Sequence, residues 1–255
     1  GHGPDRSDSL SDNVVIAISR GPDGHLWVGT QNGLNRMNAD GSFSLIPTRH
    51  PVIRDLFLDS RGDLWVASLA GLSRWDPEQE RLIAMDGLDS PYVMAIDEIE
   101  PGVLLLGTWE ADGNPGGVVA FREGDGELWR RRFSTNSIYS VLAASDGTIW
   151  AGSWGGGLFA IDRNGTIHEF TPDTERNLAD PVIYSLYEDE SGLVWVGTNG
   201  GGIHLLSPRQ RNYRVYFHDP DRPESLPQGR VTAILRDGGG TLWIGTYGGG
   251  LARRD

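Results

Sequence analysis

A short phrase recurs six times along the 255-residue chain, and this repetition limits the possible folds more than any other feature. In its last copy, residues 241–251 read Thr-Leu-Trp-Ile-Gly-Thr-Tyr-Gly-Gly-Gly-Leu. The anchor position is a tryptophan in every copy but one: Trp27, Trp65, Leu105, Trp150, Trp195 and Trp243. Successive anchors are 38 to 48 residues apart, a period typical of a repeat architecture.

Each repeat divides into four segments with the character of β-strands. The first ends at a tight turn, as Val15–Ser19 does before Asp23-Gly24, and the tryptophan phrase forms the second. A glycine turn leads to the third, such as Leu158–Ile161, and the fourth is the least regular, such as Ile167–Phe170. No segment has a persuasive helical period, so we predict an all-β chain.

Four strands in a unit of about 40 to 45 residues are typical of a β-propeller blade. A large flat tryptophan suits the space between neighbouring blades, and the glycine two places later lets one backbone approach another closely. Ala67 replaces that glycine in the second repeat, and Leu105 replaces the tryptophan in the third, where we expect different packing. The predicted fold is a single β-propeller domain or fragment over residues 1–255. It has six four-stranded repeats, at approximately 13–48, 51–86, 91–133, 136–172, 181–217 and 229–255.

Composition excludes several classes of partner. The chain has 35 acidic residues against 22 Lys plus Arg, and a net charge of −13 repels nucleic acid and anionic membranes. No apolar run approaches the roughly 18 residues of a membrane helix, so this segment is not expected to insert in a membrane. The chain has no cysteine, and its six histidines show no paired spacing. We therefore predict no disulfide, metal site or cofactor.

The repeats resemble the two-component regulator propeller repeat, with its pattern V-x-x-I-x-x-D-x-x-G-x-L-W-[VI]-G-T-x-x-G-G-L. Residues 182–205 and 231–251 follow this pattern almost throughout, and the linker Asp219–Leu226 echoes Pro4–Leu10. The resemblance implies a propeller of a large bacterial sensor, whose signalling module is a histidine kinase or a diguanylate cyclase. It also implies a periplasmic location, contact with the rest of the parent sensor, and a homodimer as one mode of assembly.

Both ends of the chain look cut from a longer protein. His2 aligns with His218, so the fourth strand that should precede the first repeat is expected to be missing. The chain also stops after the third strand of the sixth repeat. Seven blades per propeller are usual by the resemblance. We therefore expect either a six-blade ring that lacks one outer strand or part of a larger propeller, seven-bladed by the resemblance.

A ligand face is predicted where the turns between second and third strands meet the linkers that enter the first strands. The position after Gly-Thr lies on this face, and in three repeats it is aromatic. Aromatic faces beside amides and acids suit oligosaccharides, because rings stack on sugars while amides satisfy hydroxyl groups. The candidate residues are Gln31, Tyr92, Trp109, Asn136, Trp154, Asp180, Asn199, Arg230 and Tyr247. The alternative interpretation is that Trp109, Trp154 and Tyr247 simply wedge between blades.

No convergent catalytic set is visible. The turn aspartates Asp59, Asp146, Asp189 and Asp237 are expected to bond their own turn backbones, and the run Arg130–Arg132 to lie on a solvated strand face. The favoured hypothesis is a non-catalytic ligand-sensing propeller. A protein-interaction scaffold with the same aromatic rim is the alternative, and a propeller lyase or hydrolase is the third.

Overall fold

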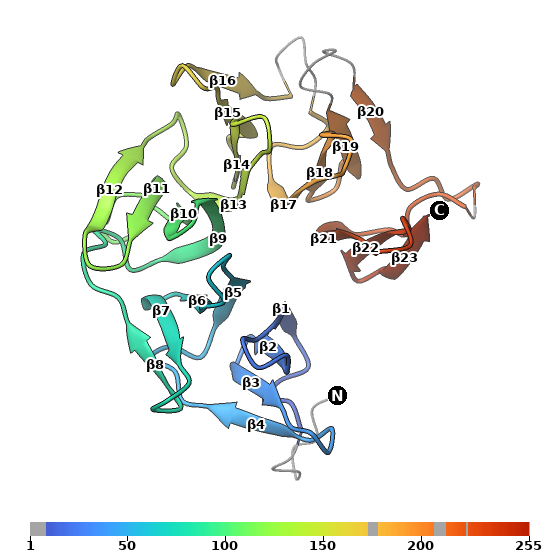
Figure 1. Ribbon diagram of the computed structural model, residues 1–255. Helices are drawn as coiled ribbons and strands as arrows, with labels where there is room; N and C mark the ends of the chain where they lie inside the picture. The colour runs from blue at the N-terminus through green and yellow to red at the C-terminus, as the bar shows by residue number, and fades with distance from the viewer. Residues whose placement is uncertain (1–8, 173–177, 207–212, 223, 255) are drawn as a thin grey trace. The chain divides into compact units, whose positions relative to one another are not determined.

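The computed structural model consists of antiparallel β-sheets (Figure 1) and describes residues 9–172, 178–206, 213–222 and 224–254. In this part of the chain, five sheets have four strands and the last has three, each ordered as in the sequence. This confirms the predicted all-β fold and its six repeats. The expected alignment of His2 falls outside the described residues. The described part contains no helix long and apolar enough to cross a membrane.

Contacts divide the chain into two compact units of three sheets each, Gly1–Arg132 and Phe133–Asp255. The prediction of a single domain stays a prediction. The first unit contains β1 (Val15–Arg20), β2 (Leu26–Thr30), β3 (Gly33–Met37), β4 (Phe43–Ile46), β5 (Ile53–Leu58), β6 (Leu64–Ser68), β7 (Gly71–Asp76), β8 (Arg81–Ala84), β9 (Val93–Glu100), β10 (Val103–Thr108), β11 (Gly117–Arg122) and β12 (Gly126–Arg131). The second contains β13 (Ile138–Ala143), β14 (Ile149–Ser153), β15 (Leu158–Ile161), β16 (Ile167–Phe170), β17 (Ile183–Glu188), β18 (Val194–Thr198), β19 (Ile203–Leu206), β20 (Tyr213–Tyr216), β21 (Arg230–Arg236), β22 (Leu242–Tyr247) and β23 (Gly250–Arg254).

Within each unit the first strands of successive sheets pack beside one another. β5 lies between β1 and β9 in the first unit, and β17 lies between β13 and β21 in the second. The anchor tryptophans fill the space between these sheets. Trp27 packs edge-on against Trp75 of the next sheet at a centroid distance of 4.8 Å, and Trp150 joins a buried cluster with Val194 and Val196. The predicted role of the tryptophan between neighbouring blades is confirmed at these positions.

The glycine column makes room mainly for a side chain of the next sheet, and at Gly197 a backbone atom, the Val231 carbonyl oxygen, also comes within 3.0 Å of an added Cβ. A Cβ added at Gly29 would lie 2.6 Å from Cγ2 of Ile53, and one at Gly152 would lie 2.5 Å from Cγ2 of Ile183. Ile53 and Ile183 are fully buried and begin the first strand of the following sheet. The expectation of a close approach was right, but its partner is a β-branched side chain, which packs against the bare glycine.

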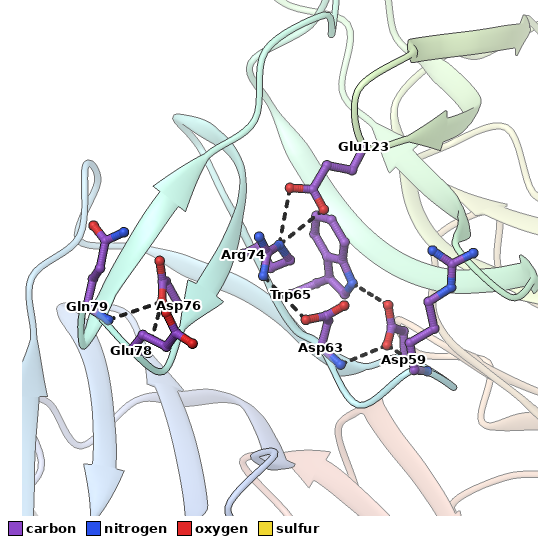
Figure 2. Close-up of polar contacts among 9 residues, drawn as sticks. Asp59, Asp63, Trp65, Arg74, Asp76, Glu78, Gln79 and Glu123 are labelled. Atoms are coloured by element: carbon purple, nitrogen blue, oxygen red, sulfur yellow. Dashed lines mark hydrogen bonds and ion pairs between the residues drawn. The ribbon is translucent and has the colours of Figure 1, made fainter.

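Three of the anchor tryptophans donate their indole N–H in a hydrogen bond to an aspartate six residues earlier. Figure 2 shows this hydrogen bond in the second sheet, where Trp65 Nε1 donates to Asp59 Oδ2 at 2.8 Å. The other carboxylate oxygen, Asp59 Oδ1, accepts the Asp63 N–H. Asp189 bonds Trp195 at 2.9 Å, and Asp237 bonds Trp243 at 2.8 Å. Each aspartate therefore fixes the turn and the indole together.

Asp146 is not in register with these three aspartates. It bonds the Thr148 N–H at 2.9 Å, but the position six residues before Trp150 is Ala144. Gly21 takes the same position before Trp27. The indole N–H groups of Trp27 and Trp150 are buried and lack a hydrogen-bond partner within the described structure. Asp146 thus bonds its own turn backbone as expected, but its two-residue offset leaves the Trp150 indole without the acceptor that the other three aspartates supply.

Candidate functional site

Every first strand contains a one-residue bulge near its start, directly after the first paired residue in five sheets and after the second, Val231, in the last. In β13, for example, Ile138 pairs with Ser153 and Ser140 pairs with Gly152, so Tyr139 is skipped. A bulge residue leaves the ladder, and its side chain is turned away from the regular alternation of the strand. The six bulge residues are Ile16, Arg54, Met94, Tyr139, Tyr184 and Thr232.

The turns between second and third strands are fixed by a hydroxyl group. Ser153 Oγ donates to the Gly157 carbonyl at 2.9 Å, and Thr198 Oγ1 donates to the Gly202 carbonyl at 2.8 Å. The same bond recurs in the other sheets, from Thr30, Ser68, Thr108 and Thr246. Because these bonds fix the backbone of each turn, the side chains of the turn residues start from a defined position.

Each of four turns is also bonded to the entry of its own first strand. The amide of Trp154 donates to the Ser137 carbonyl at 2.9 Å, and the amide of Asn199 donates to the Val182 carbonyl at 3.0 Å. Equivalent bonds join Gln31 to Val14 and Trp109 to Tyr92. The turn residue, the strand entry and the bulge of a sheet are therefore close together in space.

In the second unit these positions converge on five side chains, Tyr139, Trp154, Tyr184, Arg230 and Tyr247, which we call the aromatic–arginine cluster. The Tyr139 ring lies 5.4 Å from that of Trp154 and 5.3 Å from that of Tyr184, between centroids. Trp154 and Tyr184 meet edge to face at 5.7 Å. Three rings thus touch one another, in geometries that aromatic pairs favour.

Arg230 extends the cluster from the third sheet of this unit. Its guanidinium lies 4.3 Å from the centroid of the Tyr247 ring and 5.4 Å from that of Tyr184. Its Nη1 also donates to the Tyr184 hydroxyl at 2.9 Å. These contacts hold the cation in place by cation–π attraction and one hydrogen bond.

The cluster is accessible as well as ordered. Trp154 is 41% exposed and Tyr247 is 59% exposed, while Tyr139, Tyr184 and Arg230 are half-buried. Exposed aromatic rings braced by half-buried neighbours can stack on the flat face of a ligand without first being ordered.

The remaining candidates of this unit have local structural roles in addition to their place near the turns. Asn136 Oδ1 accepts the Phe133 amide at 2.8 Å, and Asp180 Oδ1 accepts the Val182 amide at 2.8 Å. Asn199 contributes the amide bond given above. These bonds shape the linkers and do not bring the three side chains into the ring contacts of the cluster.

Gln31, Tyr92 and Trp109 belong to the first unit. Tyr92 donates its hydroxyl to Asp112 in the long third-sheet turn at 2.5 Å, and this hydrogen bond raises the pKa of Tyr92. The turn is held further by Arg130, whose Nη1 bonds Thr108 and the carbonyls of residues 115 and 116. Arg130 is also paired with Glu127 at 2.6 Å, so assigning it to a solvated strand face was wrong.

Sequence reasoning missed Tyr139 and Tyr184. Both follow the buried isoleucine that opens a first strand, in two successive repeats. The sequence shows their shared repeat position, but that position lies in a strand, outside the turns and linkers at which the ligand face was predicted. The bulge that changes the direction of their side chains cannot be recognised from the alternation of apolar and polar residues in the sequence.

Other features of the described residues point to no second chemistry. Their His, Asp and Glu side chains include no group that could hold a metal ion. His204 is buried, accepts the Ala179 amide at 3.2 Å, and has its pKa lowered by burial. A recess of about 240 Å³, lined by Asp189, Trp195, Arg236, Gly240, Leu242 and Arg254, lies at the turns between first and second strands, at the other ends of these strands from the cluster.

Comparison with known families gives a specific match. Residues 9–32, 132–155, 177–200 and 225–248 match the family described as two component regulator propeller. No curated protein sequence matches the chain.

Several solved structures share the fold. One is the extracellular domain of the two component system BT4673 from B. thetaiotaomicron, with a TM-score of 0.78 and 17% identity over 98% of this chain. The corresponding domain of BT3049 gives 0.73 and 18% over 96%. Virginiamycin B lyase from Staphylococcus aureus gives 0.68 and 17% over 98% of this chain and 85% of the lyase. The chain spans 38% and 40% of the two extracellular domains. At these identities the likeness establishes the β-propeller fold and nothing about ligands.

Proposed function

From the four segments that match the two-component regulator propeller family, we propose that the chain is a non-catalytic ligand-recognition segment of a bacterial sensor. It acts on the periplasmic side of the parent protein. Its ligand is an oligosaccharide, which it binds at the aromatic–arginine cluster. The fold match to extracellular domains of two component systems supports the location and the sensory role.

The single observation that carries the proposal is the exposed Trp154 ring, braced by Tyr139 and Tyr184. Stacking of a sugar on such a ring is worth about 0.5–1.5 kcal/mol, by analogy with aromatic pairs. Because the bracing rings already hold Trp154, little conformational entropy is lost on binding.

The cluster favours binding over catalysis. Its five members include neither a carboxylate nor an imidazole, which general acid–base chemistry most often uses. Virginiamycin B lyase shares the fold, and a shared fold does not transfer an activity.

Signal transfer follows from the construction of the sheets. Turns closed by hydroxyl groups and sheets locked by buried tryptophans resist internal refolding. Ligand binding therefore biases contacts between this segment and the rest of the sensor, or between two sensor subunits.

The test is a tryptophan-fluorescence titration with neutral and acidic tetrasaccharides. The expected result is a saturable change that is lost in Trp154→Ala. It should persist in Trp109→Ala, which removes a tryptophan at the same repeat position in the other unit. Equal loss in both variants, or no response from any sugar with folded protein, overturns the proposal. Pull-down of a protein partner that depends on Trp154, without sugar binding, would favour the scaffold function.

A further inference from the structure

The Arg230 guanidinium is held in the cluster without a carboxylate. Among the described residues, no Asp or Glu oxygen forms an ion pair with it, whereas Arg36, Arg74, Arg122, Arg130, Arg132 and Arg222 each have an acidic partner. Arg254 likewise lies over a ring with no ion pair to a described Asp or Glu, so Arg230 is distinguished by its two ring contacts and its hydrogen bond to the Tyr184 hydroxyl. A guanidinium binds a carboxylate best through two parallel N–H groups.

The geometry leaves part of the guanidinium available. An arginine has five N–H donors, and the described contacts of Arg230 use one of them, on Nη1, for the Tyr184 hydroxyl. The guanidinium carbon also lies 5.4 Å from the centroid of the Tyr184 ring and 4.3 Å from that of Tyr247, so two rings hold the group. The guanidinium is therefore held before any ligand arrives, over the exposed Tyr247 ring and bonded to Tyr184, whose ring in turn contacts Trp154.

We propose that Arg230 is the recognition residue for a carboxylate on the ligand, so that the cluster selects acidic saccharides containing uronic acid over neutral ones. This inference rests on the proposed function, because it assigns the substrate class of the same site. A pyranose ring stacks on Trp154 while its C6 carboxylate accepts two N–H bonds from Arg230. The negative charge of the whole chain repels acidic polymers, and this local cation restores attraction for a ligand that also stacks.

The experiment compares matched sugars. Tetrasaccharides containing galacturonate, mannuronate or glucuronate are titrated by calorimetry beside their carboxyl-reduced counterparts, which keep the ring and lose the charge. At least one acidic sugar is expected to bind about 10- to 100-fold more tightly than its reduced form, the range of a charge-assisted hydrogen bond. Raising the salt concentration should weaken the acidic sugar and leave the neutral one unchanged.

Arg230→Gln should abolish this preference and leave the affinity for the reduced sugar within about twofold. Arg230→Lys, which keeps the charge but not the planar fork, should recover only part of it. The control is Arg254→Gln. Arg254 lies 4.2 Å from the centroid of the Tyr216 ring and pairs with Leu242, at the other end of β22 from the Arg230–Tyr247 pair. This variant removes the same charge and the same type of ring contact, and the preference should survive it.

The outcomes separate the two proposals. Equal binding of acidic and reduced sugars, unchanged in Arg230→Gln, overturns the carboxylate assignment and leaves sugar recognition standing. Loss of all binding in Arg230→Gln with a lowered thermal midpoint assigns Arg230 a purely structural role and also overturns the assignment. Binding by neither series to the folded parent overturns both.

Discussion

Asp59 accepts a hydrogen bond from the indole of Trp65, six residues later, at 2.8 Å, and both side chains are buried. This bond joins the turn at one end of the sheet to the residue that packs against the next sheet. The repeat therefore couples turn chemistry to inter-sheet packing through one carboxylate. This coupling can be tested by removing the aspartate acceptor from a sheet that has it and adding one to a sheet that lacks it.

Asp59→Ala leaves the Trp65 indole N–H and the backbone N–H groups of Arg61 and Asp63 without their acceptor. An unsatisfied buried donor costs about 1–3 kcal/mol, so the free energy of unfolding should fall by about that amount. Asp76→Ala, in the same sheet, removes an acceptor of backbone bonds only and should cost less. Urea unfolding of the two variants beside the parent measures the difference, and equal losses would contradict the role of the indole bond.

Ala144→Asp should supply the missing acceptor for Trp150. The turn at Ala144 has the same backbone bonds as the turn at Asp189, so an aspartate there can reach the indole N–H. The expected gain is about 1 kcal/mol in the free energy of unfolding, seen as a raised thermal midpoint. The equivalent change in the first sheet, Gly21→Asp, should destabilise the protein, since its Cβ would collide with the Trp27 indole. A stabilised Gly21→Asp protein would show that the register argument fails.

Gly152→Ala should destabilise the second unit by about 1–3 kcal/mol, because the added methyl meets Ile183 Cγ2 at 2.5 Å. Gly245 occupies the same column in the last sheet, and a Cβ there finds its nearest neighbour, Ala233 Cβ, at 3.5 Å. Gly245→Ala should therefore be close to neutral. Comparable thermal midpoints for the two variants would refute the packing role of the glycine column.

Asp55 should make the stability of the first unit depend on pH. Burial raises the pKa of its carboxyl to about 7 in the folded protein, with Asp97 adding to the rise, while the Ile96 and Leu56 amides and Arg54 oppose it. Its pKa in the unfolded chain is about 3.9. Between these values the folded protein binds more protons, so stability is highest below about pH 4 and falls as pH rises to about 7.

Asp55→Asn removes this titration and can still accept the Ile96 N–H bond that Asp55 Oδ2 accepts at 2.8 Å. The variant should be more stable than the parent above pH 7, by on the order of 2–4 kcal/mol at about 1.4 kcal/mol per pKa unit, and should show a flatter profile. Urea unfolding at pH 4.5 and pH 8 decides the matter. Parallel profiles for the two proteins would exclude Asp55 as the source.

The architecture could be predicted from the sequence because a similar pattern of residues occurs in six repeats, which indicates that they fold alike. A tryptophan followed two residues later by glycine has one physical explanation in a sheet that packs on both faces, and repetition removes the ambiguity of any single copy. The contact of Ile183 with Gly152 could not be predicted, because the sequence shows the glycine but not which atom approaches it.

The candidate site was predicted only in part. Trp154, Arg230 and Tyr247 were found from their turn and linker positions, and the structure brings them together. The two tyrosines that connect them were missed, because Tyr139 and Tyr184 owe their direction to a bulge. A ladder irregularity depends on pairing between strands, and no single strand records it.

The bulges place six side chains outside the regular alternation of the first strands. Met94 is buried, whereas the other five are at least partly exposed: Ile16, Arg54, Tyr139, Tyr184 and Thr232. Substitution at these five positions should cost less stability than substitution in the column of tryptophan and glycine. For an engineer they are sites at which the surface beside the turns can be changed while the core residues are kept.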